Sequence, residues 1–370
     1  MLQEKGDENI STLIMATQET IFLTGFPGFI AARLIKELAK GGARFVLLVQ
    51  PAFMARAREE VARLAEETGA GAERFRIVEG DITRARLGMS DAEFERACAE
   101  TTVVFHLAAI YDLAVRREPA MLVNVEGTRH VNEFARACRG LTRYHYVSTC
   151  YVAGLRTGLI RENELEHAAG FRNFYEETKY LAEVEVEKLK AELPLTIHRP
   201  AVVCGDSRTG ETVKYDGVYY LIKYLQMWPQ LLSVANIGNG DVRLNIVPVD
   251  FVVEAMAALA GDERAVGATV QLADPQPLTT GELFEAISES LLGRGSFIRL
   301  PKRLVRASLA LPLSEKLTKL PLAGVPYFFL EQTYDTRRAV ELLAPHAVSC
   351  PPFPGYVAAL IDYVARHPKL

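Results

Sequence analysis

Tyr175 and Lys179, four residues apart in the segment YEETK, form the first pattern whose residue types could do chemistry. Side chains four apart share a helix face, so we expect the Lys179 ammonium to lie beside the Tyr175 phenol. An unperturbed phenol has a pKa of about 10, and a neighbouring cation lowers that pKa by favouring the phenolate. The pair is therefore a candidate acid/base for a carbonyl or an alcohol. The same spacing is also common on helix surfaces.

A second pattern is typical of a phosphate-binding turn: Thr24-Gly25-Phe26-Pro27-Gly28-Phe29-Ile30. Glycines allow the backbone to turn sharply and to approach a pyrophosphate, and a helix N-terminus supplies amide donors. Ala31 stands where the usual fingerprint has its third glycine, and it is small enough for helix–strand packing. Two glycines alone would indicate an ordinary turn. Their position at the first strand-to-helix junction favours a dinucleotide site.

The residues after the second expected strand bear on which nicotinamide cofactor is bound. An NAD-selective site usually has an acidic residue there, but this strand ends Val49-Gln50-Pro51, and Arg56 and Arg58 follow. This favours NADP over NAD, with solvated helix arginines as the alternative.

Two further segments follow strands and are expected to contact the cofactor. Asp81 and Ile82 follow the third strand, where a carboxylate can accept from an adenine amino group, although an ordinary turn aspartate would fit equally well. Leu107, Ala108 and Ala109 close the fourth strand, and their size lets a cofactor approach the backbone. We interpret His106 as a packed strand-end residue.

Strands and helices must alternate to position these residues. Apolar or β-branched runs predict strands at 20–24, 45–49, 75–78, 103–107, 144–148 and 195–203. Helical patterns occupy 29–41, 54–68, 90–99, 123–138 and 174–192. Later, 245–260 reads as a short strand entering an apolar helix, and Thr279 with Glu282 has capping-box spacing for a helix over 279–292. The alternation predicts a doubly wound parallel α/β sheet.

Composition excludes several classes of protein. The 370 residues carry 42 Lys+Arg and 46 Asp+Glu, so the small net charge of -4 argues against nucleic acid as a partner. No apolar stretch suits an export signal or a transmembrane segment, so a cytoplasmic protein is expected. The five cysteines lack CxxC spacing and are expected to be reduced thiols rather than a disulfide framework or a metal site.

Taken together, TGFPGFI, GDI, HLAA, NVEGT, VST and YEETK resemble, in order and spacing, the extended short-chain dehydrogenase/reductases. The resemblance runs from about Thr20 to Asp274. It implies that Thr149, with Ser148 beside it, hydrogen-bonds the substrate oxygen. It also implies that Lys179 holds the nicotinamide ribose and that Asn124 lies near the cofactor.

The segment HRPAVVCGDSRTGE, residues 198–211, looks like the branch of thioester reductases and male-sterility-type fatty acyl reductases. This resemblance implies that Arg199 and Pro200 border the nicotinamide, with Val202 nearby. It also implies NADPH-dependent reduction of an acyl thioester, with an acyl-CoA, an acyl carrier or a sterol as candidate partners. Without an attached carrier domain, a free-standing reductase is expected.

The expected organisation is a flexible leader (1–18), a Rossmann-type domain (19–205 plus 240–273) and a smaller, mostly C-terminal substrate lobe (206–239 plus 274–370). Aromatics at 215–228 suit either an apolar substrate or the core of this lobe. The alternative functions are a 3β-hydroxysteroid-type dehydrogenase or a nucleotide-sugar epimerase/dehydratase. A non-catalytic NADP-binding sensor or scaffold is an alternative from another functional class. The sequence does not decide the oligomeric state, and a homodimer is one option.

Overall fold

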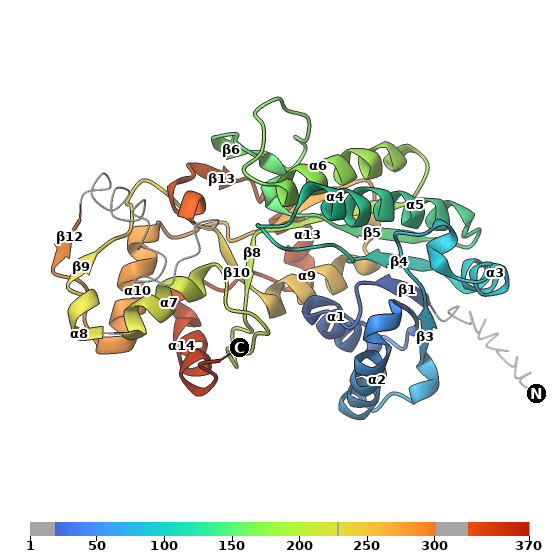
Figure 1. The fold of residues 1–370 in the computed structure, drawn as a ribbon, viewed down its shortest axis with the longest axis horizontal. Helices are drawn as coiled ribbons and strands as arrows, with labels where there is room; N and C mark the ends of the chain where they lie inside the picture. The colour runs from blue at the N-terminus through green and yellow to red at the C-terminus, as the bar shows by residue number, and fades with distance from the viewer. Residues whose placement is uncertain (1–18, 228, 301–324, 370) are drawn as a thin grey trace, which may run out of the picture.

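The computed structural model describes residues 19–227, 229–300 and 325–369 (Figure 1). The expected leader, Trp228 and the prolines at 301, 312 and 321 lie outside the described residues. The doubly wound α/β fold is confirmed by a seven-stranded sheet of order β11-β7-β5-β4-β1-β2-β3 in which every neighbouring pair is parallel. Its strands are β1 (Thr20–Thr24), β2 (Arg44–Val49), β3 (Phe75–Glu79), β4 (Val103–His106), β5 (Arg143–Val147), β7 (Leu195–Pro200) and β11 (Thr269–Leu272).

Helices cover both faces of this sheet because its strands place apolar side chains on alternate faces. Ile21 and Leu23 pack against helices on one face, whereas Phe22 packs on the other. The first layer contains α1 (Phe29–Ala39), α2 (Met54–Thr68), α9 (Val249–Ala260) and α13 (Arg337–Leu343). The opposite layer contains α3 (Asp91–Glu100), α5 (Gly127–Ala137) and α6 (Phe174–Glu187), with α4 (Arg117–Ala120) beside them (Figure 1).

The apolar run at 195–203 is divided between two sheets. After β7, Ala201 still donates to Leu272 of β11 (N–O 3.0 Å), but Val202 already donates to Asn245 (3.1 Å). The chain then forms β8 (Val202–Cys204), which pairs with β10 (Ile246–Pro248). Pro200 has no backbone N–H to extend the ladder, and the break directs the chain away from the main sheet at its carboxyl edge.

A second lobe lies beside the sheet (Figure 1). It contains α7 (Val218–Met227), α8 (Pro229–Leu232), α10 (Thr280–Leu292), α14 (Val357–Arg366) and the short pair β9 (Ala235–Asn236) and β12 (Ile298–Arg299). The capping box that begins α10 is confirmed: Thr279 N donates to Glu282 Oε2 (2.7 Å), and Glu282 N donates to Thr279 Oγ1 (3.1 Å). Tyr215 and Tyr219 are buried in the core of this lobe, so these aromatics pack rather than line a substrate cavity.

The C-terminal segment does not stay in the lobe, which corrects the expected assignment of 274–370. Strand β13 (Gln332–Tyr334) pairs with β6 (Gly158–Ile160), and α13 buries Ala339, Leu342 and Leu343 in the core beneath the large sheet. Glu162, itself buried, accepts from the α13 amides of Arg338 (2.7 Å) and Ala339 (3.1 Å). Nothing local in the sequence indicates this return, because it depends on contacts with residues far along the chain.

Among the described residues, no helix is long and apolar enough to cross a bilayer, and no group of three or more His, Cys, Asp or Glu side chains could hold a metal ion.

Candidate active site

A cavity of about 700 Å³ opens at the carboxyl ends of the central strands. This is the edge where the strand order reverses between β1 and β4, the usual ligand position in such sheets. The TGFPGFI turn and the YEETK helix, which are far apart in the sequence, both line this cavity. The expected site residues on its wall are Thr24, Gly25, Phe26, Pro27, Gly28, Phe29, Ile30, Arg56, Ile82, Leu107, Ala108, Ala109, Ser148, Thr149, Tyr175, Lys179, Pro200 and Val202.

The glycine turn has the geometry that a pyrophosphate requires. Gly25 has φ +92°, and a Cβ on it would lie 2.9 Å from the Ala108 nitrogen, so a side chain would be strained and would clash. Gly28 is the N-cap of α1, which has neither a side-chain cap nor an acidic residue in its first turn. The first amides of α1 are therefore open to an anion, and these residues fit a dinucleotide phosphate.

The wall beyond β2 is formed by Gln50, Phe53 and Arg56. Arg56 and Arg58 are both exposed, and only Arg56 belongs to the cavity wall. Asp81, expected to contact adenine, accepts from Thr83 N (2.9 Å) and Thr83 Oγ1 (2.8 Å) at its Oδ1 within its own turn. Burial by itself would raise the pKa of Asp81, but the interactions with Thr83 and Gln50 and the charge of Arg84 outweigh burial, so the pKa is lowered. Its neighbours Gly80 and Ile82 line the cavity instead.

The segment after β4 is held in place by a buried chain of hydrogen bonds. Thr24 Oγ1 lies 2.8 Å from His106 Nδ1 and accepts from Ala108 N at 3.2 Å. His106 Nε2 lies 2.9 Å from Thr128 Oγ1. Burial and the charge of Lys179 lower the pKa of His106 to about 3, so the imidazole is neutral. His106 is thus a packed strand-end residue, as its sequence position predicted.

Asn124 supports the cavity from behind rather than lining it. It lies on a π-helical turn over Met121–Glu126, where its Oδ1 accepts from Ile110 N (2.8 Å) and its Nδ2 donates to Thr178 Oγ1 (3.0 Å). These contacts fix the Leu107–Tyr111 segment against α6. Asn124, which was expected near the cofactor, therefore lies behind the residues of the cavity wall and not on the wall itself.

The side chains of Thr149 and Tyr175 both line the cavity, and a polar interaction with Thr149 favours the ionised form of the Tyr175 phenol. Thr149 is the N-cap of a short 3-10 turn and accepts from Tyr151 N (3.2 Å), which fixes its side chain. Helix α6 begins at Phe174 because the Asn173 side chain accepts from Glu176 N (3.0 Å). Tyr175 therefore occupies the first turn of a well-capped helix and is directed at the end of β5.

Lys179 does not pair with Tyr175 as expected. Its Nζ donates to Tyr146 Oη (2.9 Å) and to the Val147 carbonyl (2.8 Å), both on β5. Burial lowers the pKa of Lys179 to about 7. The negative charge of Glu183 acts in the opposite direction but is the weaker effect. Burial also raises the pKa of Tyr175, and the interaction with Thr149 offsets this only in part. The expected lowering of the phenol pKa is thus wrong for this structure, because desolvation dominates.

Arg199, expected to border the nicotinamide, is turned away from the cavity. Its Nε donates to Glu183 Oε1 (2.8 Å), and its Nη1 donates to the Glu164 carbonyl (3.1 Å). Glu183, which is also fully buried, accepts from the Ser148 hydroxyl. Arg199 is therefore a structural partner of Glu183 behind the site, whereas Pro200 does line the cavity. A buried charge needs such a partner, and strand alternation directs consecutive residues to opposite faces.

Four polar residues that motif reasoning missed also line the cavity: Tyr111, Tyr151, Lys214 and Asp216. The Tyr111 ring meets the Tyr175 ring edge-on, with centroids 5.2 Å apart. Tyr111 lies two residues after the HLAA motif and could have been found by extending it. Lys214 and Asp216 lie in an irregular segment before α7, where no spacing rule applies.

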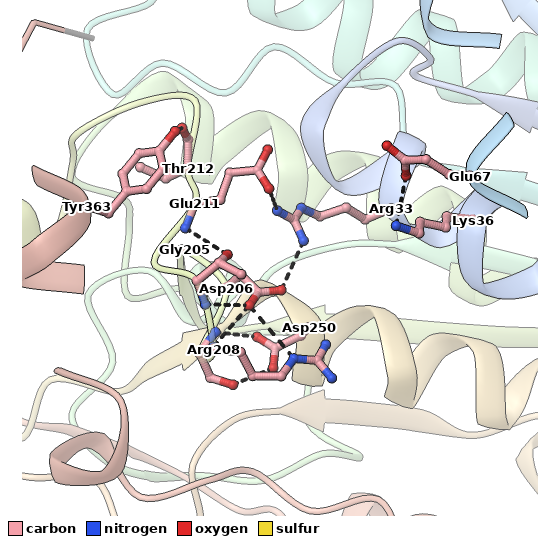
Figure 2. A network of polar contacts seen from close by, with 12 residues as sticks. Arg33, Lys36, Glu67, Gly205, Asp206, Arg208, Glu211, Thr212, Asp250 and Tyr363 are labelled. Atoms are coloured by element: carbon pink, nitrogen blue, oxygen red, sulfur yellow. Dashed lines mark hydrogen bonds and ion pairs between the residues drawn. The ribbon is translucent and has the colours of Figure 1, made fainter. Parts of the chain in front are cut away.

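A polar network fixes the loop after β8, which leads on to Lys214 and Asp216 (Figure 2). Arg33 on α1 donates to Asp206 Oδ2 (3.0 Å) and to Glu211 Oε2 (2.5 Å). Asp206 Oδ1 also accepts from the amides of Arg208 and Thr209, both at 3.0 Å. The loop after β8 is thereby tied to the same helix whose first turn faces the phosphate site.

Comparisons with known proteins agree with this geometry. A family model of NAD-binding domains described as "Male sterility protein" matches residues 23–256. Glycine betaine reductase ATRR of Emericella nidulans is 29% identical over 303 residues, which cover 76% of this chain and 23% of that protein. An alcohol-forming fatty acyl-CoA reductase of Simmondsia chinensis is 29% identical over 181 residues, 35% of this chain and 37% of that protein. The chain therefore spans well under half of either relative.

Among solved structures, the terminal R domain from the myxalamid PKS-NRPS biosynthetic pathway superimposes with a TM-score of 0.79 at 27% identity. The match covers 96% of this chain and 93% of that domain. The similarity therefore includes the second lobe as well as the sheet.

Proposed function

Since this chain belongs to the male sterility protein family of NAD(P)-dependent reductases, we propose that it reduces an acyl thioester to an aldehyde. The observation that carries the proposal is one cavity lined by the glycine turn, by Lys179 and by the hydroxyl-bearing side chains of Thr149 and Tyr175. A carbonyl held against these hydroxyls would lie beside the cofactor's position. The fatty acyl-CoA reductase among its relatives acts on the same class of substrate.

The cofactor would be held by the open amides of α1 and by Lys179. The ammonium has three N–H donors, of which the described residues use two, at Tyr146 and Val147. The third would hold the nicotinamide ribose. A bound NADPH or NADH supplies the hydride, and the absence of a carboxylate at Gln50, together with Arg56 on the wall, favours NADPH.

Thr149 and Tyr175 would polarise the thioester carbonyl by donating hydrogen bonds to its oxygen. The raised pKa of Tyr175 keeps the phenol protonated at neutral pH, so it can give its proton to the oxygen as hydride reaches the carbon. In the resulting hemithioacetal, the hydroxyl proton returns to the Tyr175 phenolate as the carbon–sulfur bond breaks. The thiolate leaves with a proton from solvent, and the aldehyde remains.

For a simple aldehyde or ketone, Tyr175 would supply the proton to the oxygen, and the reaction would end there because no carbon–sulfur bond has to break. We propose an acyl-CoA or a thioester on an acyl carrier as the substrate, with a sterol ketone as the competing candidate. An epimerase would retain a recycled NAD and show no net NADPH consumption. A sensor or scaffold would bind the cofactor without turnover.

The test is steady-state NADPH oxidation and NADP reduction across acyl-CoAs, long-chain aldehydes and sterols. Tyr175→Phe should lower kcat on the best thioester by roughly 10²- to 10⁴-fold, because it removes the proton donor. Tyr180→Phe is the matched control, since Tyr180 lies on the same helix but packs against His167 and Phe171. Wild-type turnover by Tyr175→Phe would refute the mechanism, and activity on sterols alone would refute the substrate class.

A further inference from the structure

Lys214 and Asp216 are charged groups on the substrate side of the cavity, and the reaction proposed above does not use them. The Lys214 ammonium lies 3.6 Å from Asp216 Oδ2 and 5.3 Å from the centre of the Tyr111 ring. Tyr111 in turn contacts the Tyr175 ring and lines the same cavity wall as Asp216. The pair is thus one aromatic ring away from the phenol that faces the reacting carbonyl.

This pair is partly desolvated, which makes a plain hydrocarbon a poor neighbour for it. The Asp216 side chain is 19% exposed and that of Lys214 is 57% exposed. An alkyl chain lying against both groups would remove their remaining water without replacing its hydrogen bonds, which is unfavourable. A substrate that carries both an acceptor and a donor at this depth would compensate for the lost water.

The loop that leads to the pair is held in place by side chains of three helices. Besides the contact between Arg33 and Asp206, Ser207 N donates to Asp250 Oδ1 (2.8 Å), and Tyr363 Oη donates to the Thr212 carbonyl (3.3 Å). These contacts tie the segment to α1, α9 and α14 respectively (Figure 2). Anchoring the loop favours binding at the pair, because less backbone has to be ordered when a ligand arrives.

We propose that Lys214 and Asp216 form an amide-binding subsite that selects thioesters carrying a secondary amide near the reacting carbonyl. The amide carbonyl accepts from the Lys214 ammonium, and the amide N–H donates to the Asp216 carboxylate. This deepens the proposed function and rests on it. The amide can belong to the acyl group, as in an aminoacyl or peptidyl chain, or to the thiol, as in a pantetheine-like arm.

The test compares four thioesters of equal chain length in kcat/KM with NADPH. The acyl group either contains one internal secondary amide or is all methylene, and the thiol is either N-acetylcysteamine or an alkanethiol of the same length. Wild-type enzyme should prefer an amide-bearing thioester by about 10- to 100-fold over the all-methylene one, as expected for hydrogen bonds to charged groups. The position of the preferred amide identifies its source.

Asp216→Leu and Lys214→Met should each bring this preference ratio close to one, while Lys188→Met, an exposed lysine just after α6, should keep it. NADPH binding, followed by fluorescence, establishes that each variant is folded. Equal wild-type rates on all four thioesters, or an unchanged ratio in both variants, would overturn the subsite and leave the reductase proposal intact. Failure of the wild type to reduce any of the four would overturn both.

Discussion

Arg33 and Asp206, 173 residues apart in the sequence, are joined by a hydrogen-bonded ion pair with Nη1 and Oδ2 3.0 Å apart. Arg33 belongs to α1, whose first turn faces the phosphate site, and Asp206 begins the loop that leads to Lys214 and Asp216. The Asp206 side chain is only 6% exposed, so its charge depends on this partner and on two backbone amides. The two sides of the cavity are therefore coupled mechanically.

Arg33→Met should loosen this coupling. We expect the free energy of unfolding to fall by about 1–3 kcal/mol, because a nearly buried carboxylate loses a charged donor. The KM for the thioester should rise more than the KM for NADPH, since the freed loop lines the substrate side. Chemical denaturation and steady-state kinetics measure both effects. Arg63→Met, which breaks only exposed pairs on α2, should change stability by less than about 0.5 kcal/mol.

Lys179 should impose a pH limit on activity. Its pKa is lowered to about 7 by burial, so raising the pH above this value removes the ammonium that would hold the ribose. We expect kcat/KM with NADPH to be level below pH 7 and to fall about tenfold per pH unit above it. A profile that is flat to pH 9 would contradict this assignment. Lys188→Met should keep the wild-type profile.

The burial of Lys179 should also make the free energy of unfolding depend on pH. The unfolded chain has the ordinary lysine pKa of 10.5, so between about pH 7 and 10.5 it binds more protons at Lys179 than the folded protein does. The contribution of this residue to stability should therefore rise with pH across that window. Denaturation of wild type and Lys179→Met at several pH values measures it: wild type should gain stability relative to the variant as the pH increases.

Gly25→Ala should damage the phosphate turn. The new Cβ would lie 2.9 Å from the Ala108 nitrogen at a backbone with φ +92°. We expect a loss of about 1–3 kcal/mol in stability and a large rise in the Kd for NADPH, measured by denaturation and fluorescence titration. Gly69→Ala is the control: Gly69 also has positive φ, but no atom lies within 4 Å of its Cβ position. It should leave the Kd unchanged.

Gln50 and Arg56 should set the cofactor preference. Gln50→Asp would place a carboxylate where NAD-selective sites bind the ribose hydroxyls, so the ratio of kcat/KM for NADPH to that for NADH should fall. Arg56→Ala should raise the KM for NADPH by roughly tenfold or more and affect NADH little, because only NADPH carries the 2′-phosphate. Arg58→Ala, on the same helix but off the cavity wall, should behave as wild type. Equal effects on both cofactors would refute a role for Arg56 in phosphate binding.

The sequence by itself determined the features that depend on neighbouring residues. The first βα unit, the Thr279 capping box and the order of strands and helices follow from periodicity, caps and turns, and the structure confirms them. The glycine turn and the YEETK helix could be assigned to one site because parallel strands bring their carboxyl ends to one edge. The strand β11 and the return of α13 to the sheet had no such local signal.

The tertiary structure alone decided what each site residue contacts. Lys179 bonds to Tyr146 rather than to Tyr175, and Arg199 faces Glu183 rather than the cavity. Asp216 reaches the wall from a segment without a motif. These outcomes depend on burial and on partners from distant strands, and burial sets the direction of the pKa shifts of His106, Tyr175 and Lys179. Helical spacing places two side chains on one face, but packing determines where their ends lie and which charges are desolvated.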